Sequence, residues 1–239
     1  MKRTLFIASG FTILLSSLAH AGEARSISIA SNGGSASATA TATGNSSSLA
    51  VAGATNGGRA IANSDAIGTR NGRADSRAIA AADRGLAVSN SRADARGTFG
   101  GSAIADSESV AVTIGGVAIS NSEALARGRL FGHADSRSIA TSTSIFGRAI
   151  SNSQAVSDGV LGGVATSVSD AYSDALFGDS VSDVRAISGA ELFGRASADG
   201  IGVSISGPSR RAESRVHAEG RAYRFGQSRS TAAMVRIER

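Results

Sequence analysis

Small and larger side chains alternate along most of the chain with a period of two residues. In the segment 164–176, Ala and Ser occupy the odd positions, and larger residues such as Val168 and Tyr172 occupy the even ones. A period of two places successive side chains on opposite faces of an extended strand, whereas an amphipathic helix repeats every 3.6 residues. Gly and Ser are also unfavourable inside helices. The pattern therefore predicts an all-β chain.

The motif Gly-x-Ala or Gly-x-Ser gives the chain an internal repeat of about 15 residues. Its glycines are Gly58, Gly72, Gly85, Gly101, Gly116, Gly132, Gly147, Gly163, Gly178, Gly194, Gly207 and Gly220. Every Phe after residue 21 directly precedes a Gly, and these Phe residues are one or two repeats apart. A disordered Gly/Ser-rich linker has no reason to keep such a spacing, so the repeat argues for an ordered fold.

Each repeat contains two candidate corners, the Gly at its start and an Asn or Asp followed by Ser in its middle. We therefore predict a β-solenoid with two short strands in each coil of about 15 residues, Ala and Ser inside, and like residues stacked about 4.8 Å apart. The alternative is an antiparallel β-meander in which each repeat is one long strand, because the alternation continues through the proposed corner. The predicted ladders are Asn63, Asn90, Asn121 and Asn152 as corners, and Phe99, Phe131, Phe146, Phe177 and Phe193 as an apolar seam.

Residues 1–21 have the composition of a cleaved secretory signal peptide. Lys2 and Arg3 precede an apolar run that ends at Leu18, and residues 19–21 (Ala-His-Ala) have the small-x-small form of a cleavage site. The run is shorter than the roughly 20 apolar residues that a membrane-spanning helix needs. We expect a secreted, cell-surface or periplasmic product with a β-solenoid region at 22–206 and an Arg-rich C-terminal cap or tail at 207–239.

Few side chains in this sequence are suited to catalysis. The chain has no Cys, and beyond residue 21 it has two histidines, His133 next to a repeat-start Gly and His217 in the Arg-rich tail. It contains no nucleophile elbow, phosphate-binding loop, His-Glu-x-x-His motif or calcium-binding Gly-rich nonapeptide. We therefore predict no enzymatic activity, no metal site and no cofactor.

Positive charge is concentrated in residues 207–239, which hold eight Arg and three Glu. Arg side chains pair with phosphate and carboxylate groups, so this end is a candidate binding surface for an anionic polysaccharide or another polyanion. An alternative is a polar cap that prevents end-to-end stacking of the solenoid. The candidate polyanion-binding residues are Arg210, Arg211, Arg215, Arg221, Arg224 and Arg229.

Segments 34–44 (GSASATATATG), 48–53 (SLAVAG) and 101–111 (GSAIADSESVA) resemble the repeats in the heads of trimeric autotransporter adhesins. This resemblance implies a left-handed parallel β-roll that trimerises. No heptad stalk or C-terminal membrane strands follow the repeats, so the anchoring and export of that family do not carry over. The signal peptide and the stacked strand-turn-strand units also resemble curli-type amyloid subunits, although the Gln/Asn ladder spacing of that family is missing.

These features together predict a secreted, non-enzymatic structural protein. We expect a β-rod that self-associates or adheres in a bacterial surface layer, biofilm matrix or fibre, with further copies of itself as its main partner. The first alternative is an adhesin that binds an anionic polysaccharide or other polyanion through the Arg-rich end. The second is a β-helical carbohydrate-active enzyme, which would require an acidic cleft on one face.

Overall fold

The computed structural model describes residues 22–69, 72–98, 102–129, 131–207 and 210–238, which form thirteen β-strands and no helix. The predicted all-β chain is confirmed, and the signal peptide and Phe99 lie outside the described residues. The strands are β1 (Glu23–Ala30), β2 (Ser35–Thr43), β3 (Ser46–Ala54), β4 (Arg59–Gly68), β5 (Arg73–Ala82), β6 (Gly85–Gly97), β7 (Ser102–Arg129), β8 (His133–Val160), β9 (Val164–Ala175), β10 (Ser180–Glu191), β11 (Arg195–Ser206), β12 (Ala212–Tyr223) and β13 (Gln227–Glu238).

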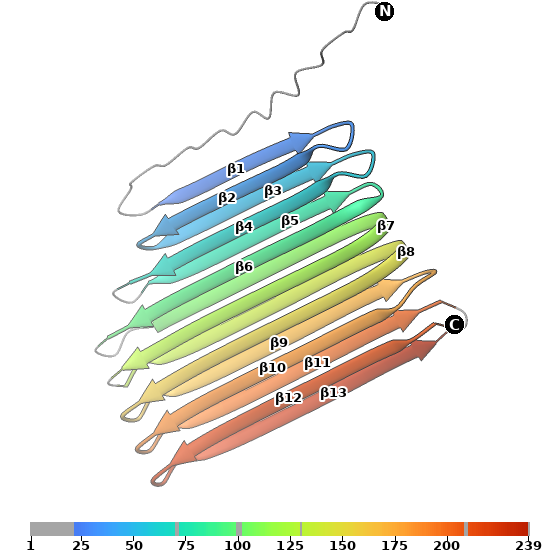
Figure 1. Ribbon diagram of the computed structural model, residues 1–239. Coiled ribbons are helices and arrows are strands. Elements are labelled where there is room, and N and C mark those ends of the chain that lie inside the picture. The colour runs from blue at the N-terminus through green and yellow to red at the C-terminus, as the bar shows by residue number, and fades with distance from the viewer. Residues whose placement is uncertain (1–21, 70–71, 99–101, 130, 208–209, 239) are drawn as a thin grey trace, which may run out of the picture.

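The strands coil into a two-layered β-solenoid, and every strand pairing among the described residues is parallel (Figure 1). Sheet 1 contains β1, β3, β5, the first halves of β7 and β8, β9, β11 and β13. Sheet 2 contains β2, β4, β6, the second halves of β7 and β8, β10 and β12. The chain therefore alternates between the sheets, which confirms the solenoid and excludes the antiparallel meander.

One coil contains two long strands rather than two short ones. Asn90 on β6 lies beside Asn121 on β7, 31 residues further along the chain, so each repeat of about 15 residues is half a coil. The predicted two short strands in each 15-residue coil are therefore wrong. The middle of the repeat does not bend, because its small inward Ser continues the alternation and its Asn side chain points outward within a strand.

The solenoid interior consists almost entirely of Ala, Ser and Gly, as predicted. Ala62, Ala124 and Ser89 are fully buried, and their small side chains allow the sheets to approach closely enough for serine hydroxyls to bridge them. Ser122 Oγ on sheet 2, for example, lies 2.9 Å from Ser107 Oγ on sheet 1. We call this alternating chain of hydrogen-bonded serines the serine zigzag. Its members are Ser48, Ser64, Ser76, Ser91, Ser107, Ser122, Ser138, Ser153 and Ser169.

Most of the repeat-start glycines lie at the edges of the solenoid, where the chain passes from one sheet to the other. Gly147 has a φ of 148°, and a Cβ atom there would lie 1.8 Å from the carbonyl oxygen of Gly116 in the coil below. Only a residue without a side chain permits this close approach of two backbones. The prediction of a corner at the repeat-start Gly is therefore confirmed for the described glycines from Gly58 to Gly207. It is wrong for Gly220, which lies inside β12 opposite Ser188, and Gly101 lies outside the described residues.

Candidate functional site

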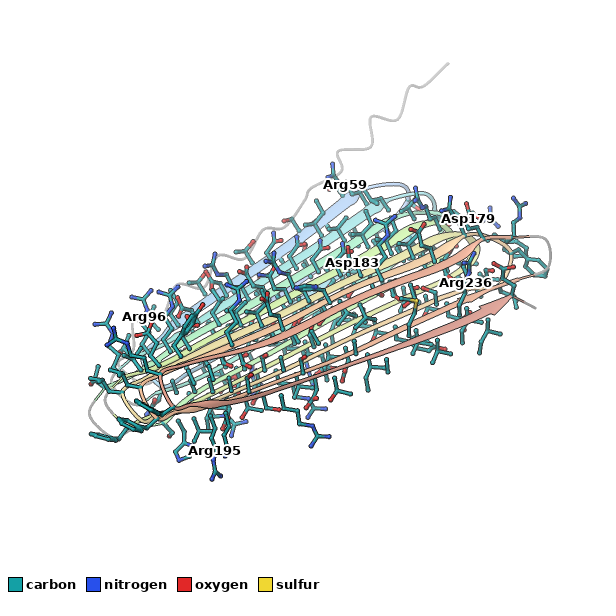
Figure 2. All side chains as sticks on the ribbon, turned by 90° about the horizontal axis from the view of Figure 1, so that it is seen from below. Arg59, Arg96, Asp179, Asp183, Arg195 and Arg236 are labelled. Carbon is teal, nitrogen blue, oxygen red and sulfur yellow. The ribbon has the colours of Figure 1, made fainter. Side chains whose placement is uncertain are left out.

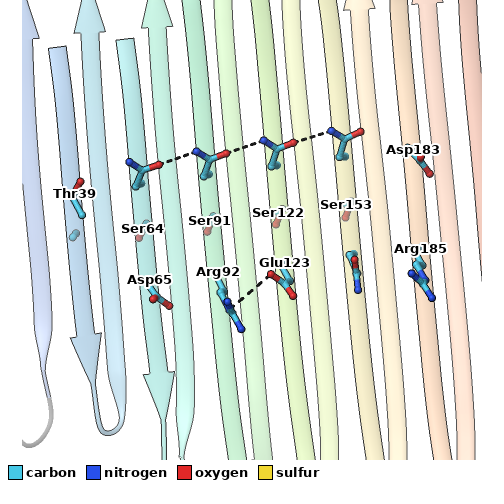
Figure 3. A pocket seen from close by; sticks show the side chains of 16 residues that line it. Thr39, Ser64, Asp65, Ser91, Arg92, Ser122, Glu123, Ser153, Asp183 and Arg185 are labelled. Carbon is cyan, nitrogen blue, oxygen red and sulfur yellow. Dashed lines mark hydrogen bonds and ion pairs between the residues drawn. The ribbon is translucent and has the colours of Figure 1, made fainter. Parts of the chain in front are cut away.

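The four predicted ladder asparagines form a continuous hydrogen-bonded ladder on the outer face of sheet 2 (Figure 3). Asn90 Nδ2 donates to Asn63 Oδ1 over 2.8 Å, and bonds of the same length join Asn121 to Asn90 and Asn152 to Asn121. All four residues lie inside strands, so the predicted corner position is wrong. In a parallel in-register sheet each outward amide lies beside its counterpart and bonds to it rather than to its own backbone.

A groove of about 670 Å³ runs beside this ladder along the solenoid axis. The row next to the asparagines alternates in charge, with Asp65, Arg92 and Glu123 on successive strands of sheet 2. Arg92 Nε lies 3.8 Å from Glu123 Oε2. Burial raises the pKa of Asp65 above its usual value, although the positive charge of Arg92 opposes this rise. The groove therefore offers amide and charged groups to a polar, extended ligand.

A second groove, of about 500 Å³, lies on the outer face of sheet 1 and is lined mainly by ion pairs. Arg73 Nη2 lies 3.2 Å from Asp106 Oδ2, and Arg77 pairs with Glu108 on the next strand of the sheet. Burial raises the pKa of Asp106, which the nearby charge of Arg73 lowers in part. Arg77 lies directly across from Glu108, and Arg73 lies diagonal to Asp106. Opposite charges on neighbouring strands stabilise the register of the sheet. The two faces of the solenoid, seen from its end in Figure 2, thus carry different polar chemistry, with Asp183 on one and Arg195 on the other.

Sequence reasoning missed a group of outward-facing apolar residues on sheet 1, which we call the apolar strip. It consists of two adjacent rows on β1, β3, β5 and β7: Ile27, Val51, Ile79 and Val110, and Ile29, Gly53, Ala81 and Val112. The side chains of Ile27 and Ile29 are 61% and 81% exposed. The strip becomes visible in the sequence only when residues of alternate repeats are aligned, because these are the residues that stack.

The predicted phenylalanine seam is divided between the two edges of the solenoid and is exposed. Phe146 and Phe177 stack at one edge with ring centroids 5.0 Å apart, whereas Phe131 and Phe193 lie at the opposite edge, where Phe193 stacks on Phe225 at 5.5 Å. Phe131 and Phe193 are 72% and 70% exposed. A single buried seam is therefore wrong, because successive repeats are half-coils and turn at alternate edges.

The described part of the Arg-rich segment, residues 210–238, forms the last coil of the solenoid, in which β12 pairs with β10 and β13 with β11. Three of the six candidate polyanion-binding arginines are in ion pairs: Arg211 and Arg215 with Glu213, and Arg221 with Glu219. The candidates are distributed over different surfaces rather than one site. Arg210 and Arg211 precede β12, Arg215 and Arg221 lie on β12, Arg224 lies in the turn after it, and Arg229 lies on β13.

The two histidines occupy different parts of the solenoid. His133 begins β8 in sheet 1, and His217 lies on β12 in sheet 2, where its Nε2 is 3.5 Å from Glu219 Oε2. The described part of the chain contains no group of three or more His, Asp or Glu side chains arranged to hold a metal ion.

Comparison with known proteins gives no relative. No protein-family model, no curated protein and no solved structure matches this chain. None of the described residues belongs to a helix that is long and apolar enough to cross a membrane.

Proposed function

We propose that this protein is a secreted, non-enzymatic structural protein whose solenoid associates with further copies of itself in a bacterial surface layer, biofilm matrix or fibre. The observation that supports this proposal is the apolar strip, in which outward apolar residues lie in register on four neighbouring strands, exposed at Ile27, Ile29 and Val112 and half-buried at Val51, Ile79 and Val110. Contiguous exposed apolar surface on a folded domain is typical of an interaction site.

The shape of the strip suits an apolar side chain of a second copy. Gly53 and Ala81 lie between Ile29 and Val112 in one row, so the surface has a shallow depression there that an apolar side chain can enter. Burying apolar surface contributes about 25 cal/mol for each Å² removed from water. A stable interface of ordinary size covers roughly 800 Å² on each partner, which is more than the two rows of the strip provide. Other outward residues of sheet 1 around the strip must therefore belong to the interface as well.

Polyanion binding at the Arg-rich end has weaker support. Arg211 and Arg215 share the carboxylate of Glu213, and Arg221 pairs with Glu219, so a polyanion would have to displace Glu213 or Glu219 from these side chains. Such exposed pairs are individually weak. The dispersion of the six arginines over several surfaces is the stronger argument for preferring self-association.

Analytical ultracentrifugation and electron microscopy of the exported chain over a wide concentration range test the proposal. We expect assemblies for the wild type and a shift to smaller species for Ile79→Lys, which places a charge in the centre of the strip. Thr141→Lys is the matched control, because Thr141 lies in the same row on β8 beyond the apolar residues. A wild-type chain that remains monomeric at every concentration would refute the proposal.

Mass spectrometry of the exported chain tests secretion separately. Loss of residues 1–21 from material recovered outside the cytoplasm is the expected result. Retention of these residues in a cytoplasmic chain would contradict it.

A further inference from the structure

The two ends of the solenoid are open sheet edges with different side chains. Among the described residues, β1 pairs only with β3 and β2 only with β4 at one end, whereas β12 pairs only with β10 and β13 only with β11 at the other. An open edge is a template for pairing with another strand, and proteins that remain monomeric usually block it.

The C-terminal end is blocked by large and charged residues at inward positions. The inward positions of β13 include Met234, Arg236 and Glu238. The same rows hold small residues on β11, where Ser204 is the register partner of Arg236. Arg236 Nη2 and Glu238 Oε1 form an ion pair of 3.0 Å. A further coil stacked on this end would bury that pair, and removing two charges from water is costly. Inward-pointing charges are a known means of preventing edge-to-edge association.

The N-terminal end has no such block. The inward positions are occupied by Ala24, Ser26, Ser28 and Ala30 on β1 and by Ala36, Ala38, Ala40 and Ala42 on β2. These are the residue types found throughout the interior. Another pair of strands can therefore be added at this end without burying a charge or a large side chain.

Head-to-tail stacking does not fit the order of the strands. β1 and β13 both belong to sheet 1, so placing β1 of one copy on β13 of the next leaves an empty strand position in sheet 2 between β12 and β2. It would also bury Arg236 and Glu238. The N-terminal ends of two copies, by contrast, fit each other.

We propose that two copies of this chain pair through their N-terminal ends, with β1 of each copy bound antiparallel to β2 of the other. The N-terminal end of the solenoid has the shape of a step, because β1 in sheet 1 extends half a coil further along the solenoid axis than β2 in sheet 2. A two-fold axis parallel to the strands places the step of one copy into the step of the other and continues both sheets without a gap. The interface is thus a closed, symmetric one. The pairing rests on the proposed self-association and on removal of residues 1–21.

The backbone of both strands fits this arrangement. Ala30 O accepts from Thr55 N, and Gly34 O accepts from Arg59 N, so the even-numbered residues of β1 and β2 face β3 and β4. Because backbone groups alternate in direction along a strand, the odd-numbered residues face the open edge.

The two-fold axis fixes the register, because it leaves the position of each residue along the strands unchanged. Each residue of β1 therefore lies opposite the β2 residue that faces it across the interior of one copy. The contact of Ser48 with Ser64 places Ala24 across from Ala40, so Ile27 lies opposite Ser37 of the second copy, and odd-numbered residues of the two strands bond to each other. In the same register the even-numbered Ala and Ser remain inside, as the alternation requires. The strands also match in length, with 8 residues in β1 and 9 in β2.

Disulfide trapping tests the register, since the chain has no native cysteine. Opposite residues in a hydrogen-bonded antiparallel pair have Cα atoms about 5.5 Å apart, which suits a disulfide. We expect the double variant Ile27→Cys, Ser37→Cys to form a covalent dimer and no larger species on mild oxidation. The control is Ile27→Cys, Val235→Cys, because these two residues lie in one row of sheet 1 and would meet in head-to-tail stacking. Polymers of the control variant, with no dimer of the first, would overturn the proposal.

Charge exchange at the same positions provides a second measurement. Ile27→Arg with Ser37→Arg places like charges opposite each other twice, and we expect dimer affinity to fall at least tenfold in ultracentrifugation. Ile27→Arg with Ser37→Glu should restore it, because the two positions lie on opposite faces of one copy and meet only between copies. Unchanged thermal unfolding of each variant shows that the fold is retained.

The outcomes separate this pairing from the general proposal. Wild-type assemblies without the Ile27–Ser37 cross-link overturn the N-terminal pairing alone. A chain that is monomeric at every concentration overturns both.

Discussion

The substitution Ser107→Val tests whether the interior is as closely packed as the serine zigzag indicates. Ser107 Oγ donates to the carbonyl oxygen of Ser91 over 2.8 Å, and Ser122 Oγ lies 2.9 Å from Ser107 Oγ on the other side. The hydroxyl is therefore enclosed between the two sheets, and Ser107 is 3% exposed. A valine at this position loses the hydrogen bond and also adds bulk where the sheets are closest.

The two effects can be separated by comparison with Ser107→Ala. Alanine removes the donated hydrogen bond, whereas Ser122 Oγ keeps its 2.7 Å bond to the carbonyl oxygen of Ser107. The expected loss in free energy of unfolding is about 1 kcal/mol. Valine loses the same bond, and overpacking of a close-packed interior costs about 1–3 kcal/mol more. Each kcal/mol corresponds to a decrease of roughly 2–4 °C in Tm for a chain of this size.

Thermal unfolding followed by circular dichroism measures the difference between the two variants. Thr141→Val is the matched control, because it introduces the same side chain at an outward position on β8 and should change Tm little. If Ser107→Val and Ser107→Ala unfold at the same temperature, the interior has room for two methyl groups. The close approach of the sheets would then be wrong.

Three further substitutions test other features of the solenoid by thermal unfolding. Burial raises the pKa of Asp170, whose Oδ1 has no hydrogen-bond partner. Its carboxylate therefore destabilises the fold as the pH rises from the unfolded pKa of about 4 through the higher folded pKa. Asp170→Asn should raise Tm at pH 7, and an equal gain at pH 3 would contradict this cause. Asn121→Asp should lower stability by about 1–2 kcal/mol, because it places a carboxylate oxygen against the Asn90 amide oxygen, and an unchanged Tm would show that the ladder bonds contribute nothing. Gly147→Ala should lower Tm far more than Gly53→Ala, since an added Cβ at Gly53 has no atom within 4 Å; similar losses would refute the steric role of the corner glycines.

The sequence was sufficient to predict the features that depend on local alternation. Which side chains face inward follows from the period of two, so the buried Ala and Ser rows were correctly expected. The repeat-start Gly was correctly placed at a corner, because only glycine tolerates the backbone contact seen at Gly147. These conclusions need no knowledge of which strands pair.

The coil length could not be obtained in the same way, because strand pairing joins residues that are distant in the sequence. A repeat of half a coil and a repeat of a whole coil produce the same alternation and the same glycine spacing. The asparagines contained the missing information, since Asn63, Asn90, Asn121 and Asn152 occur in alternate repeats only. The intervening repeats carry Asp106 or Arg137 at the corresponding place on sheet 1, a difference that distinguishes the two faces.

The apolar strip and the unequal ends were inaccessible for the same reason. Ile27 and Val110 belong to one surface only because three successive pairings bring their strands side by side. The inward position of Arg236 likewise depends on its alignment with Ser204. The sequence indicates that the last coil is positively charged, but it does not indicate which of the charged side chains point into the interior of the solenoid.

The half-coil repeat constrains how the length of this rod can change during evolution. Deletion of one repeat would transfer every later strand to the opposite layer, so the asparagine face would be interrupted and each later edge phenylalanine would move to the other side. Deletion or duplication of two repeats, about 31 residues as between Asn90 and Asn121, restores every residue to its own face. Variants of this protein that differ in length should therefore differ by whole turns.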